Sequence, residues 1–388
     1  MPFSGASGPH NAKIMFVLEA WGEREAELGK PLVGASGQET IRLCLESGLS
    51  KDTALAESII SGMWRDAKMN PHSMLSLREL WLDKASMLWT NVFNLRPSYD
   101  SNDIKLLCAS KKEVGGAAYP YAPFSQGKYF RPEFFPHIER LKQEIETVKP
   151  NLILACGGTA TWALLGSSAI TAIRGAATEC KLVPGIKVLP TYHPASIFRK
   201  WDWRPVILAD LMKAAREREF PEIIRPRRRV LINPTLAELY AFEAELNTPA
   251  KRDCILSVDI ETKAKQITCL CFADSSERSV VIPFWGPNPA RPHYWATPQE
   301  EVAAWSLAGR LLAGPWPKLF QNGMYDLQYL ARMGFKVMNC REDTMLLHHS
   351  LFPELPKGLG FMGSIYTNEA AWKLMNRVKK EDALKRDE

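Results

Sequence analysis

Short apolar runs alternate with amphipathic segments through the first 219 residues. Apolar runs bounded by polar or turn residues predict buried strands at 12–18, 87–95, 151–157 and 187–194. Apolar residues at helical spacing predict helices at 38–49, 132–149, 159–166 and 203–219. Strands that alternate with helices in this way predict a mostly parallel α/β sheet.

The segment 220–229, FPEIIRPRRR, interrupts this pattern with two prolines and a run of charge. Beyond it the pattern predicts strands at 229–234, 255–262, 266–273 and 279–285, then helices at 300–314 and 322–334. A chain of 388 residues exceeds one ordinary core. We therefore predict one α/β domain over 1–219, a basic linker over 220–229, and a second α/β domain over 230–388 that begins with antiparallel strands.

Composition places the chain among globular proteins, with 46% hydrophobic residues. No apolar run approaches the roughly 18 residues that span a bilayer, and the N-terminal residues lack the apolar core of a secretory signal. These features predict a cytoplasmic protein. The eight cysteines contain no C-x-x-C pair and are spread thinly, which predicts free thiols.

The net charge of +6 is modest, but its distribution is uneven. Between Lys213 and Arg229 there are seven Lys or Arg residues and three Glu residues. Such a stretch can contact nucleic-acid phosphates, here through Arg227 and Arg228. A solvated linker explains the same charge equally well, so both interpretations stay open.

The second domain carries acidic residues at spacings typical of a metal site. In the strand SVDIET, the period of two places Asp259 and Glu261 on one face. In QNGMYDLQYL, Asn322 and Asp326 are four apart, which predicts one shared helix face. Adjacent carboxylates repel unless cations lie between them, and hard divalent ions prefer oxygen ligands. We therefore expect Mg²⁺ or Mn²⁺ at Asp259, Glu261 and Asp326.

These segments resemble a known family. SVDIET is similar to the first motif of DEDD-type 3′–5′ exonucleases, and QNGMYDLQYL is similar to their second motif, N-x-x-x-[FY]-D. The segment from DTMLLHHS onward resembles the corresponding part of phage DNA polymerases. The resemblance covers about 228–388 and implies a ribonuclease H-like fold. It also implies a metal-dependent exonuclease in which Asn322 and Tyr325 contact nucleic acid.

The sequence departs from this family at its third motif. No Tyr or His after Asp343 stands four residues before an Asp, and Asp382 and Asp387 lack the surrounding motif. Either a partner chain supplies the missing residues, or the domain is inactive alone. We expect Asp343 to be structural, and His348 and His349 to be a packed or surface pair.

Four segments of the first domain follow one another in a recognisable order: FVLEAWGEREAELGKPLVGASGQ, WTNVFNLRP, PNLILACGGTATWALLG and PTYHPASIFR. They resemble, in the same order, motifs of the uracil-DNA glycosylase superfamily, especially its type-4 branch. Such enzymes take the target base out of the stack and into a pocket. The resemblance therefore implies a uracil pocket in residues 12–204.

The residue types in these segments suit that chemistry. The Asn91 amide can pair with the N3–H and O4 edge of uracil, and His193 can donate to O2 as negative charge develops there. Glu19 can position water or stabilise the sugar cation. The helix that starts at the 34–37 turn can hold a phosphate or the base. Among the residues flanking these loops, we expect contacts to DNA from Lys30, Leu32 and Arg199.

Some positions differ from the type-4 pattern. Leu18 and Trp21 replace the motif's Gly and Pro, and Leu32 replaces the aromatic residue that stacks on the flipped base. No cysteine precedes Cys44, and His137 occupies a position that holds a cluster ligand in that branch. We therefore expect no iron–sulfur cluster.

Together the two halves resemble the N-terminal part of a phage-type DNA polymerase or a subunit of a split one. One hypothesis is a DNA replication and repair enzyme that joins uracil recognition to 3′–5′ proofreading beside a polymerase. The other is a catalytically degenerate DNA-binding or uracil-sensing subunit that tethers a polymerase. Activity of either site in the isolated chain stays open at this point.

Overall fold

The computed structural model describes residues 1–63, 70–115, 119–288 and 291–369. The described chain forms two compact units: unit 1 is Met1–Ile223 together with residues 360–369, and unit 2 is Ile224–Leu359. Residues 360–369, expected in the second domain, thus belong to unit 1. The physical reason is a set of hydrogen bonds from the Lys213 ammonium to backbone carbonyls of that segment, including Thr367 at 2.7 Å. Asp382 and Asp387 lie outside the described residues.

Unit 1 is built on a five-stranded sheet in the order β2-β1-β5-β7-β6. Its strands are β1 (Ile14–Ala20), β2 (Met87–Phe93), β5 (Leu152–Cys156), β6 (Thr178–Glu179) and β7 (Lys187–Thr191). Strands β2, β1, β5 and β7 run parallel, and β6 pairs antiparallel with β7. A short pair, β3 (Cys108–Ala109) and β4 (Tyr129–Phe130), lies apart from this sheet. The apolar strands are almost entirely buried, as the sequence pattern predicts.

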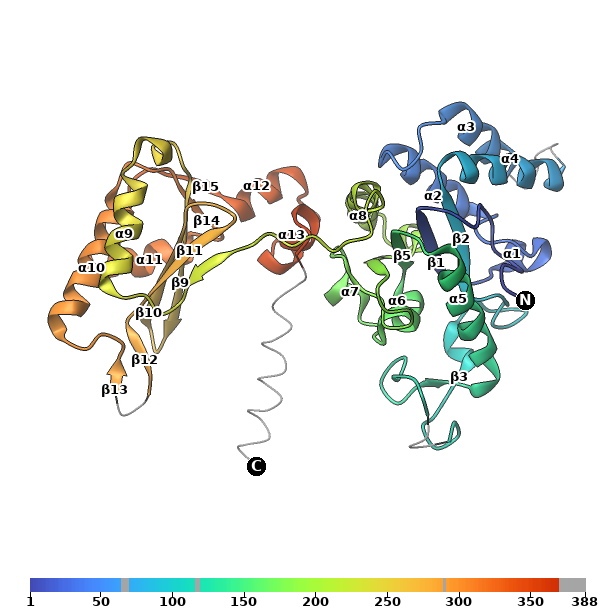
Figure 1. Ribbon diagram of the computed structural model, residues 1–388, viewed down its shortest axis with the longest axis horizontal. Helices are drawn as coiled ribbons and strands as arrows, with labels where there is room; N and C mark the ends of the chain where they lie inside the picture. The colour runs from blue at the N-terminus through green and yellow to red at the C-terminus, as the bar shows by residue number, and fades with distance from the viewer. Residues whose placement is uncertain (64–69, 116–118, 289–290, 370–388) are drawn as a thin grey trace. The chain divides into compact units, whose positions relative to one another are not determined.

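Figure 1 shows the helices of unit 1. They are α1 (Glu23–Leu28), α2 (Ala35–Glu46), α3 (Thr53–Gly62), α4 (Pro71–Lys84), α5 (Phe135–Val148), α6 (Gly158–Leu165), α7 (Ile170–Ile173), α8 (Trp203–Glu217) and α13 (Leu359–Tyr366). Short 3₁₀ turns are η1 (Ile104–Leu107), η3 (Pro132–Phe134) and η4 (Pro194–Phe198). In α5, Ile138, Leu141 and Ile145 recur at helical spacing and are buried, so this face packs into the core.

Unit 2 contains a six-stranded sheet in the order β15-β14-β9-β10-β11-β8. Its strands are β8 (Arg229–Leu231), β9 (Leu256–Lys263), β10 (Gln266–Ala273), β11 (Arg278–Pro283), β14 (Lys318–Phe320) and β15 (Cys340–Asp343). The predicted antiparallel portion is β9, β10 and β11, whereas β14 runs parallel to β9 and to β15. Strand β8 runs parallel to β11, and a separate hairpin pairs β12 (Trp285–Asn288) with β13 (Arg291–His293).

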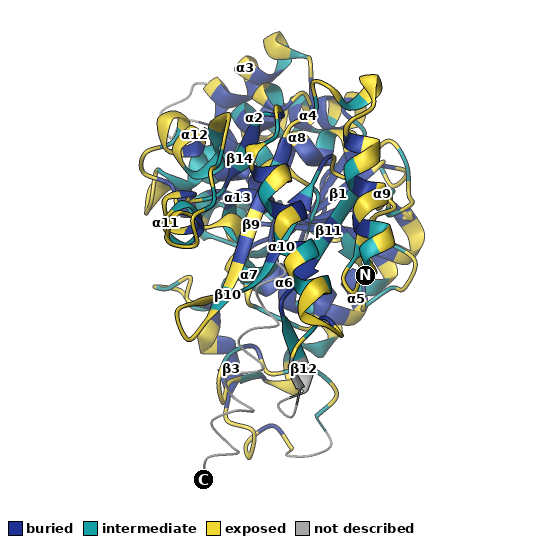
Figure 2. Cartoon of the chain, turned by 90° about the vertical axis from the view of Figure 1, so that its left-hand side faces the viewer, coloured by how far each residue is buried: buried dark blue, intermediate teal, exposed yellow. Residues whose placement is uncertain are grey.

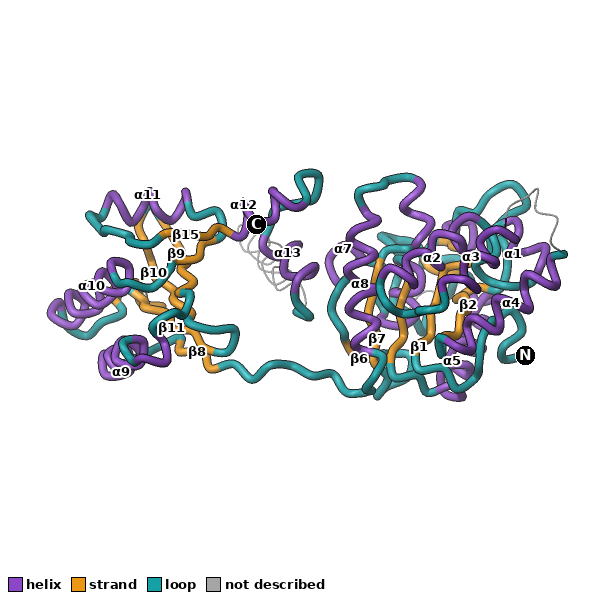
Figure 3. Tube along the Cα trace, turned by 90° about the horizontal axis from the view of Figure 1, so that it is seen from above, coloured by secondary structure: helices purple, strands orange, loops and turns teal. Residues whose placement is uncertain are grey.

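The helices of unit 2 are α9 (Leu236–Leu246), α10 (Pro298–Ala313), α11 (Met324–Arg332) and α12 (Thr344–Leu351). Helices α9 and α10 lie on one side of the sheet (Figure 3). Their buried residues pack on Val258 and Ile260 of β9, whose neighbours Asp259 and Glu261 are exposed; Figure 2 shows this alternation along the strand. Capping boxes at Thr235 and Thr297 begin both helices. The α/β class predicted for the two halves is confirmed. Among the described residues, no helix is long and apolar enough to cross a membrane.

Candidate functional site

A cavity of about 790 Å³ opens at the carboxyl ends of the parallel strands in unit 1. Glu19 lies near the end of β1, Asn91 lies in β2, Gly157 follows β5 and His193 follows β7, and all four line the cavity. Parallel α/β sheets place ligands at this edge because the carboxyl ends of neighbouring strands meet there. The fold therefore brings together three residues that are far apart in the sequence and that we predicted to be catalytic.

His193 is held as a neutral ring with a defined tautomer. Its Nδ1 accepts a hydrogen bond from the Ala195 N–H at 3.1 Å, at the start of η4. A nitrogen that accepts cannot carry the proton, so Nε2 carries it. Burial lowers the pKa of His193 to about 4, and the charge of Arg199 adds to this effect. The ring is therefore a neutral N–H donor near neutral pH.

The pKa of His193 predicts how the stability of unit 1 depends on pH. The folded pKa of about 4 lies below the ordinary value of 6.5, so the unfolded chain binds a proton that the folded chain excludes. The free energy of unfolding is therefore unaffected by this group above pH 6.5 and decreases as the pH falls from 6.5 toward 4, because protonation stabilises the unfolded chain. We expect melting curves between these pH values to show about one proton more taken up on unfolding for the wild type than for His193→Gln. Equal pH slopes for the two proteins would contradict this.

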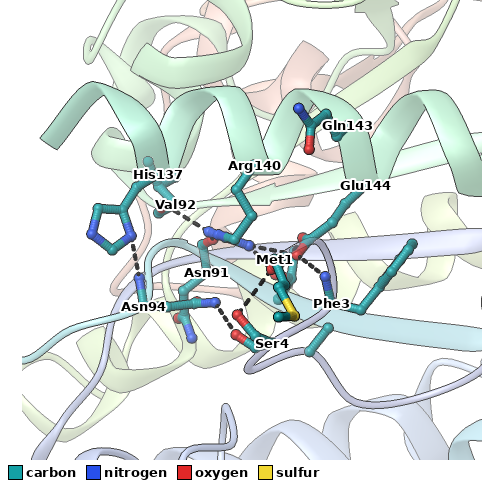
Figure 4. A network of polar contacts seen from close by, with 12 residues as sticks. Met1, Phe3, Ser4, Asn91, Val92, Asn94, His137, Arg140, Gln143 and Glu144 are labelled. Atoms are coloured by element: carbon teal, nitrogen blue, oxygen red, sulfur yellow. Dashed lines mark hydrogen bonds and ion pairs between the residues drawn. The ribbon is translucent and has the colours of Figure 1, made fainter.

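Asn91 is fixed by its backbone, which leaves its side chain available. The Arg140 guanidinium donates to the carbonyl oxygens of Asn91 at 2.6 Å and Val92 at 2.9 Å. Arg140 is itself held by Glu144 at 2.7 Å, within the network that Figure 4 shows. Asn91 is only 2% exposed, and its Nδ2 has no hydrogen-bond partner among the described residues. A buried amide without a partner is costly, and a ligand with a matching acceptor removes that cost.

Glu19 faces the start of α6. Its carboxylate accepts a short hydrogen bond from the Thr159 hydroxyl, in the first turn of that helix. Burial raises the pKa of Glu19, and the Thr159 hydrogen bond opposes this shift. A carboxylate whose pKa moves toward neutrality is a better proton acceptor than an ordinary exposed one.

The loop that precedes α2 is braced on several sides. Leu32 has a left-handed φ of 53° and is 4% exposed. Arg78, fully buried, donates to the Pro31 carbonyl at 2.7 Å, and Glu25 accepts from the N–H groups of Val33 and Gly34. A Cβ on Gly37 would lie 1.9 Å from the Leu32 carbonyl oxygen, so this position requires glycine. The loop is thus held in one conformation at the cavity wall.

The other predicted contact residues of unit 1 divide into two groups. Leu32 and Arg199 line the cavity. Lys30 is not among its lining residues, because its ammonium donates to the Ala6 carbonyl at 2.6 Å. His137, noted from the sequence, accepts the Asn94 N–H at 3.3 Å (Figure 4).

Several lining residues were not predicted from the sequence. Trp21, Tyr192 and Trp203 supply aromatic surface, and the Tyr192 and Trp203 rings stack at 4.4 Å. Trp21 and Tyr192 stand inside the quoted motifs, where aromatic rings beside Glu19 and His193 were an available signal.

Residues 6–217 match the family model of the uracil DNA glycosylase superfamily. The chain belongs to this superfamily. The match spans the cavity and all of its lining residues, so the uracil DNA glycosylase fold is the scaffold of the site.

The search of curated proteins found no match. Among solved structures, the chain is similar to Escherichia coli RNase D, an exoribonuclease involved in structured RNA processing. The identity is 16% and the TM-score is 0.27, over 39% of this chain and 36% of RNase D. The chain thus matches only about a third of the length of that protein.

The predicted acidic residues of unit 2 lie at β9 and the first turn of α11. Asp326 is 3% exposed, and its Oδ1 accepts the Ile260 N–H at 3.0 Å. Ile260 is the residue between Asp259 and Glu261 in the sequence of β9. Burial raises the pKa of Asp326 to about 6; the Ile260 hydrogen bond opposes this and the charge of Asp259 adds to it. Within the part of the chain that is described, no group of three or more His, Cys, Asp or Glu residues is placed to hold a metal ion. The carboxylates suit Mg²⁺ chemically, but they do not form a complete set of ligands.

Asn322 does not share a helix face with Asp326, so that prediction is wrong. Helix α11 begins at Met324, and Asn322 precedes it with a left-handed φ of 59°. The Asp343 carboxylate holds this turn by accepting the N–H groups of Asn322 at 3.1 Å and Gly323 at 2.7 Å. It also caps α12 through the Met345 N–H at 2.8 Å, which confirms the structural role expected for Asp343.

The remaining residues singled out from the sequence differ in exposure and in their contacts. Tyr325 is 45% exposed, and its hydroxyl lies 2.5 Å from that of Thr262. His348 is buried and His349 is exposed, as expected for a packed or surface pair. Arg227 and Arg228 are exposed, and Arg228 donates to the Ser276 carbonyl at 3.1 Å. All eight cysteines are free thiols, as predicted.

Proposed function

We propose that unit 1 binds a uracil base extruded from DNA and hydrolyses its glycosidic bond. The observation that supports this most directly is the convergence of Glu19, Asn91 and His193 on one cavity, with an unpartnered Asn91 amide and a neutral His193 donor. Membership of the uracil DNA glycosylase superfamily agrees with this function.

The three residues divide the chemistry. The Asn91 Nδ2 donates to uracil O4, and its Oδ1 accepts the N3–H, a pattern that cytosine cannot satisfy. When the bond between C1′ and N1 breaks, its electron pair leaves with uracil and charge develops on O2, where the His193 Nε2–H donates. Water adds to C1′ and loses its proton to Glu19, giving an abasic site and the uracil anion, which then takes a proton from solvent. Leu32 offers the base a weaker stacking surface than an aromatic residue would. Trp21, which also lines the cavity, supplies an aromatic face for the base.

Incubation with a uracil-containing oligonucleotide tests this proposal. Heating in alkali should then cleave the strand at the uracil position and leave a matched thymine strand intact. If binding prefers uracil but no abasic product forms, the domain is a uracil sensor and the hydrolysis proposal is rejected. If there is neither preference nor product, the uracil site itself is rejected.

We propose a second function for unit 2, namely Mg²⁺- or Mn²⁺-dependent removal of nucleotides from 3′ ends beside a DNA polymerase. The supporting observation is that the Asp326 carboxylate accepts the backbone N–H of Ile260, the residue between Asp259 and Glu261 in β9. Because no Tyr or His after Asp343 stands four residues before an Asp, we propose that the polymerase partner supplies the remaining ligand. Asn322, Tyr325, Arg227 and Arg228 remain the proposed contacts to DNA in this unit.

A nuclease assay tests the role of the carboxylates. With Mg²⁺ and a candidate polymerase partner, we expect degradation of a strand labelled at its 5′ end, and at least roughly 100-fold slower degradation by Asp259→Ala/Glu261→Ala, which removes metal ligands. The exposed pair Asp253→Ala/Glu277→Ala, also in unit 2, is the matched control. Equal rates for wild type and the Asp259/Glu261 variant would reject this second function.

A further inference from the structure

Unit 2 contains a cavity of about 530 Å³ whose lining does not include Asp259, Glu261 or Asp326. It lies at the β9–β10 turn and is lined by residues from this turn, from the end of β11 and from helices α10 and α11. Its volume falls within the range of about 300–1,000 Å³ that is usual for small-ligand sites. Neither of the functions proposed above uses this cavity.

Aromatic side chains form much of its wall. Phe284 and Trp305 stack at 3.3 Å with an interplanar angle of 4°, and Trp285 and Tyr329 line the same cavity. Phe284 is 2% exposed, whereas Trp285, Trp305 and Tyr329 are only half-buried. Flat rings that remain partly exposed in a cavity offer stacking surfaces, and every nucleobase has a matching face.

Positive charge accompanies these rings. Lys265 and Arg332 line the cavity, and neither forms a salt bridge within the described parts of the chain. The Lys263 ammonium lies 5.5 Å from the Trp285 ring, and the Arg332 guanidinium lies 5.7 Å from the Tyr329 ring. One acidic residue, Glu301, also lines the cavity and lies 3.0 Å from His293, so the two lining cations outnumber it. The charge therefore favours an anionic planar ligand.

We propose that this aromatic cavity binds an unpaired nucleobase and that Lys265 and Arg332 contact its phosphate. The combination matches single-strand binding sites, in which bases stack on aromatic rings while cations follow the backbone. The proposal does not depend on uracil hydrolysis by unit 1 or on metal binding by unit 2.

Photo-crosslinking tests the location of the base. A short thymine oligonucleotide containing one 5-iododeoxyuridine is irradiated with the full chain, and the crosslinked peptides are identified by mass spectrometry. We expect crosslinks at Trp285, Trp305 or Tyr329. Crosslinks confined to peptides of unit 1 would overturn the proposal.

Binding measurements with matched variants complete the test. Trp285→Ala should weaken binding of a fluorescent thymine oligonucleotide by roughly 5- to 150-fold, the usual effect of losing one stacked base. Lys265→Glu/Arg332→Glu changes only exposed residues, so it keeps the test valid if Trp285→Ala does not fold. Tyr240→Ala removes an exposed ring of α9 outside the cavity and should bind like the wild type.

A competition experiment between thymidine monophosphate and the oligonucleotide shows whether the cavity takes a free nucleotide or a base within a strand. If thymidine monophosphate displaces the oligonucleotide and binds with the same dependence on Trp285, the cavity takes free nucleotides as well as strands. If only the oligonucleotide binds, the cavity takes a base within a strand. Wild-type affinity for both ligands in Trp285→Ala and in the double charge variant would overturn the proposal.

Discussion

Replacing His193 with alanine is expected to slow uracil excision by roughly 100- to 1,000-fold, as the loss of one preorganised donor to a developing negative charge does in other enzymes. The Ala195 N–H occupies Nδ1 at 3.1 Å, so Nε2 is the atom that donates. The low pKa, about 4, keeps the ring neutral, and the donor position therefore does not change across neutral pH. Single-turnover rates on a uracil-containing strand measure the effect.

The kinetic pattern separates this role from a general loss of structure. A donor that acts mainly on the leaving uracil should lower the single-turnover rate with little change in strand affinity. His72→Ala is the matched control, because His72 is exposed on α4 and does not line the cavity. A His193→Ala protein that excises uracil at the wild-type rate would remove His193 from the mechanism.

Replacing Asp210 with alanine is expected to lower the free energy of unfolding of unit 1 by about 3–5 kcal/mol. Asp210 is fully buried and accepts from Arg174 Nη2 at 2.9 Å, Arg174 Nε at 3.2 Å and the Thr191 hydroxyl at 2.8 Å. Lys213, 2% exposed, lies in the same cluster. Alanine would leave the Arg174 and Lys213 cations buried without their carboxylate, which costs more than the pair itself contributes.

The same substitution should loosen residues 360–369. Arg174 donates to the Ser364 hydroxyl at 2.7 Å, and Lys213 donates to the Thr367 carbonyl at 2.7 Å, so both cations of the cluster hold this segment. Calorimetry should show a fall of roughly 6–20 °C in the transition of unit 1, and limited proteolysis should cut the segment sooner. Asp83→Ala, an exposed site on α4, should stay within about 0.5 kcal/mol of wild type. Equal stability of the Asp210 and Asp83 variants would contradict the argument.

Much of the local structure follows from the sequence because its causes are local. The apolar runs of β1, β2, β5 and β7 and the helical spacing in α5 predict the parallel sheet and its cover, and the structure confirms them. The alternation in SVDIET places Asp259 and Glu261 on one exposed face, as observed. These patterns need only the period of a strand or a helix.

Other features depend on contacts between residues far apart in the sequence. The turn at Asn322 is left-handed because the carboxylate of Asp343 holds two of its N–H groups, which no helical period could indicate. In the same way, Arg78 is separated by 47 residues from the Pro31 carbonyl that it fixes. Neither contact has a sequence signal, since each depends on how separate elements pack.

The sequence by itself determined the residue types of the site, the order of the motifs and the elements that carry them. Only the tertiary structure decided that Glu19, Asn91 and His193 meet in one cavity, because the strand order brings β1, β2 and β7 to the same edge. It also decided that residues 360–369 complete unit 1, through hydrogen bonds from the buried Arg174 and Lys213. Burial and pairing at long sequence separation set these outcomes, and a local pattern does not contain them.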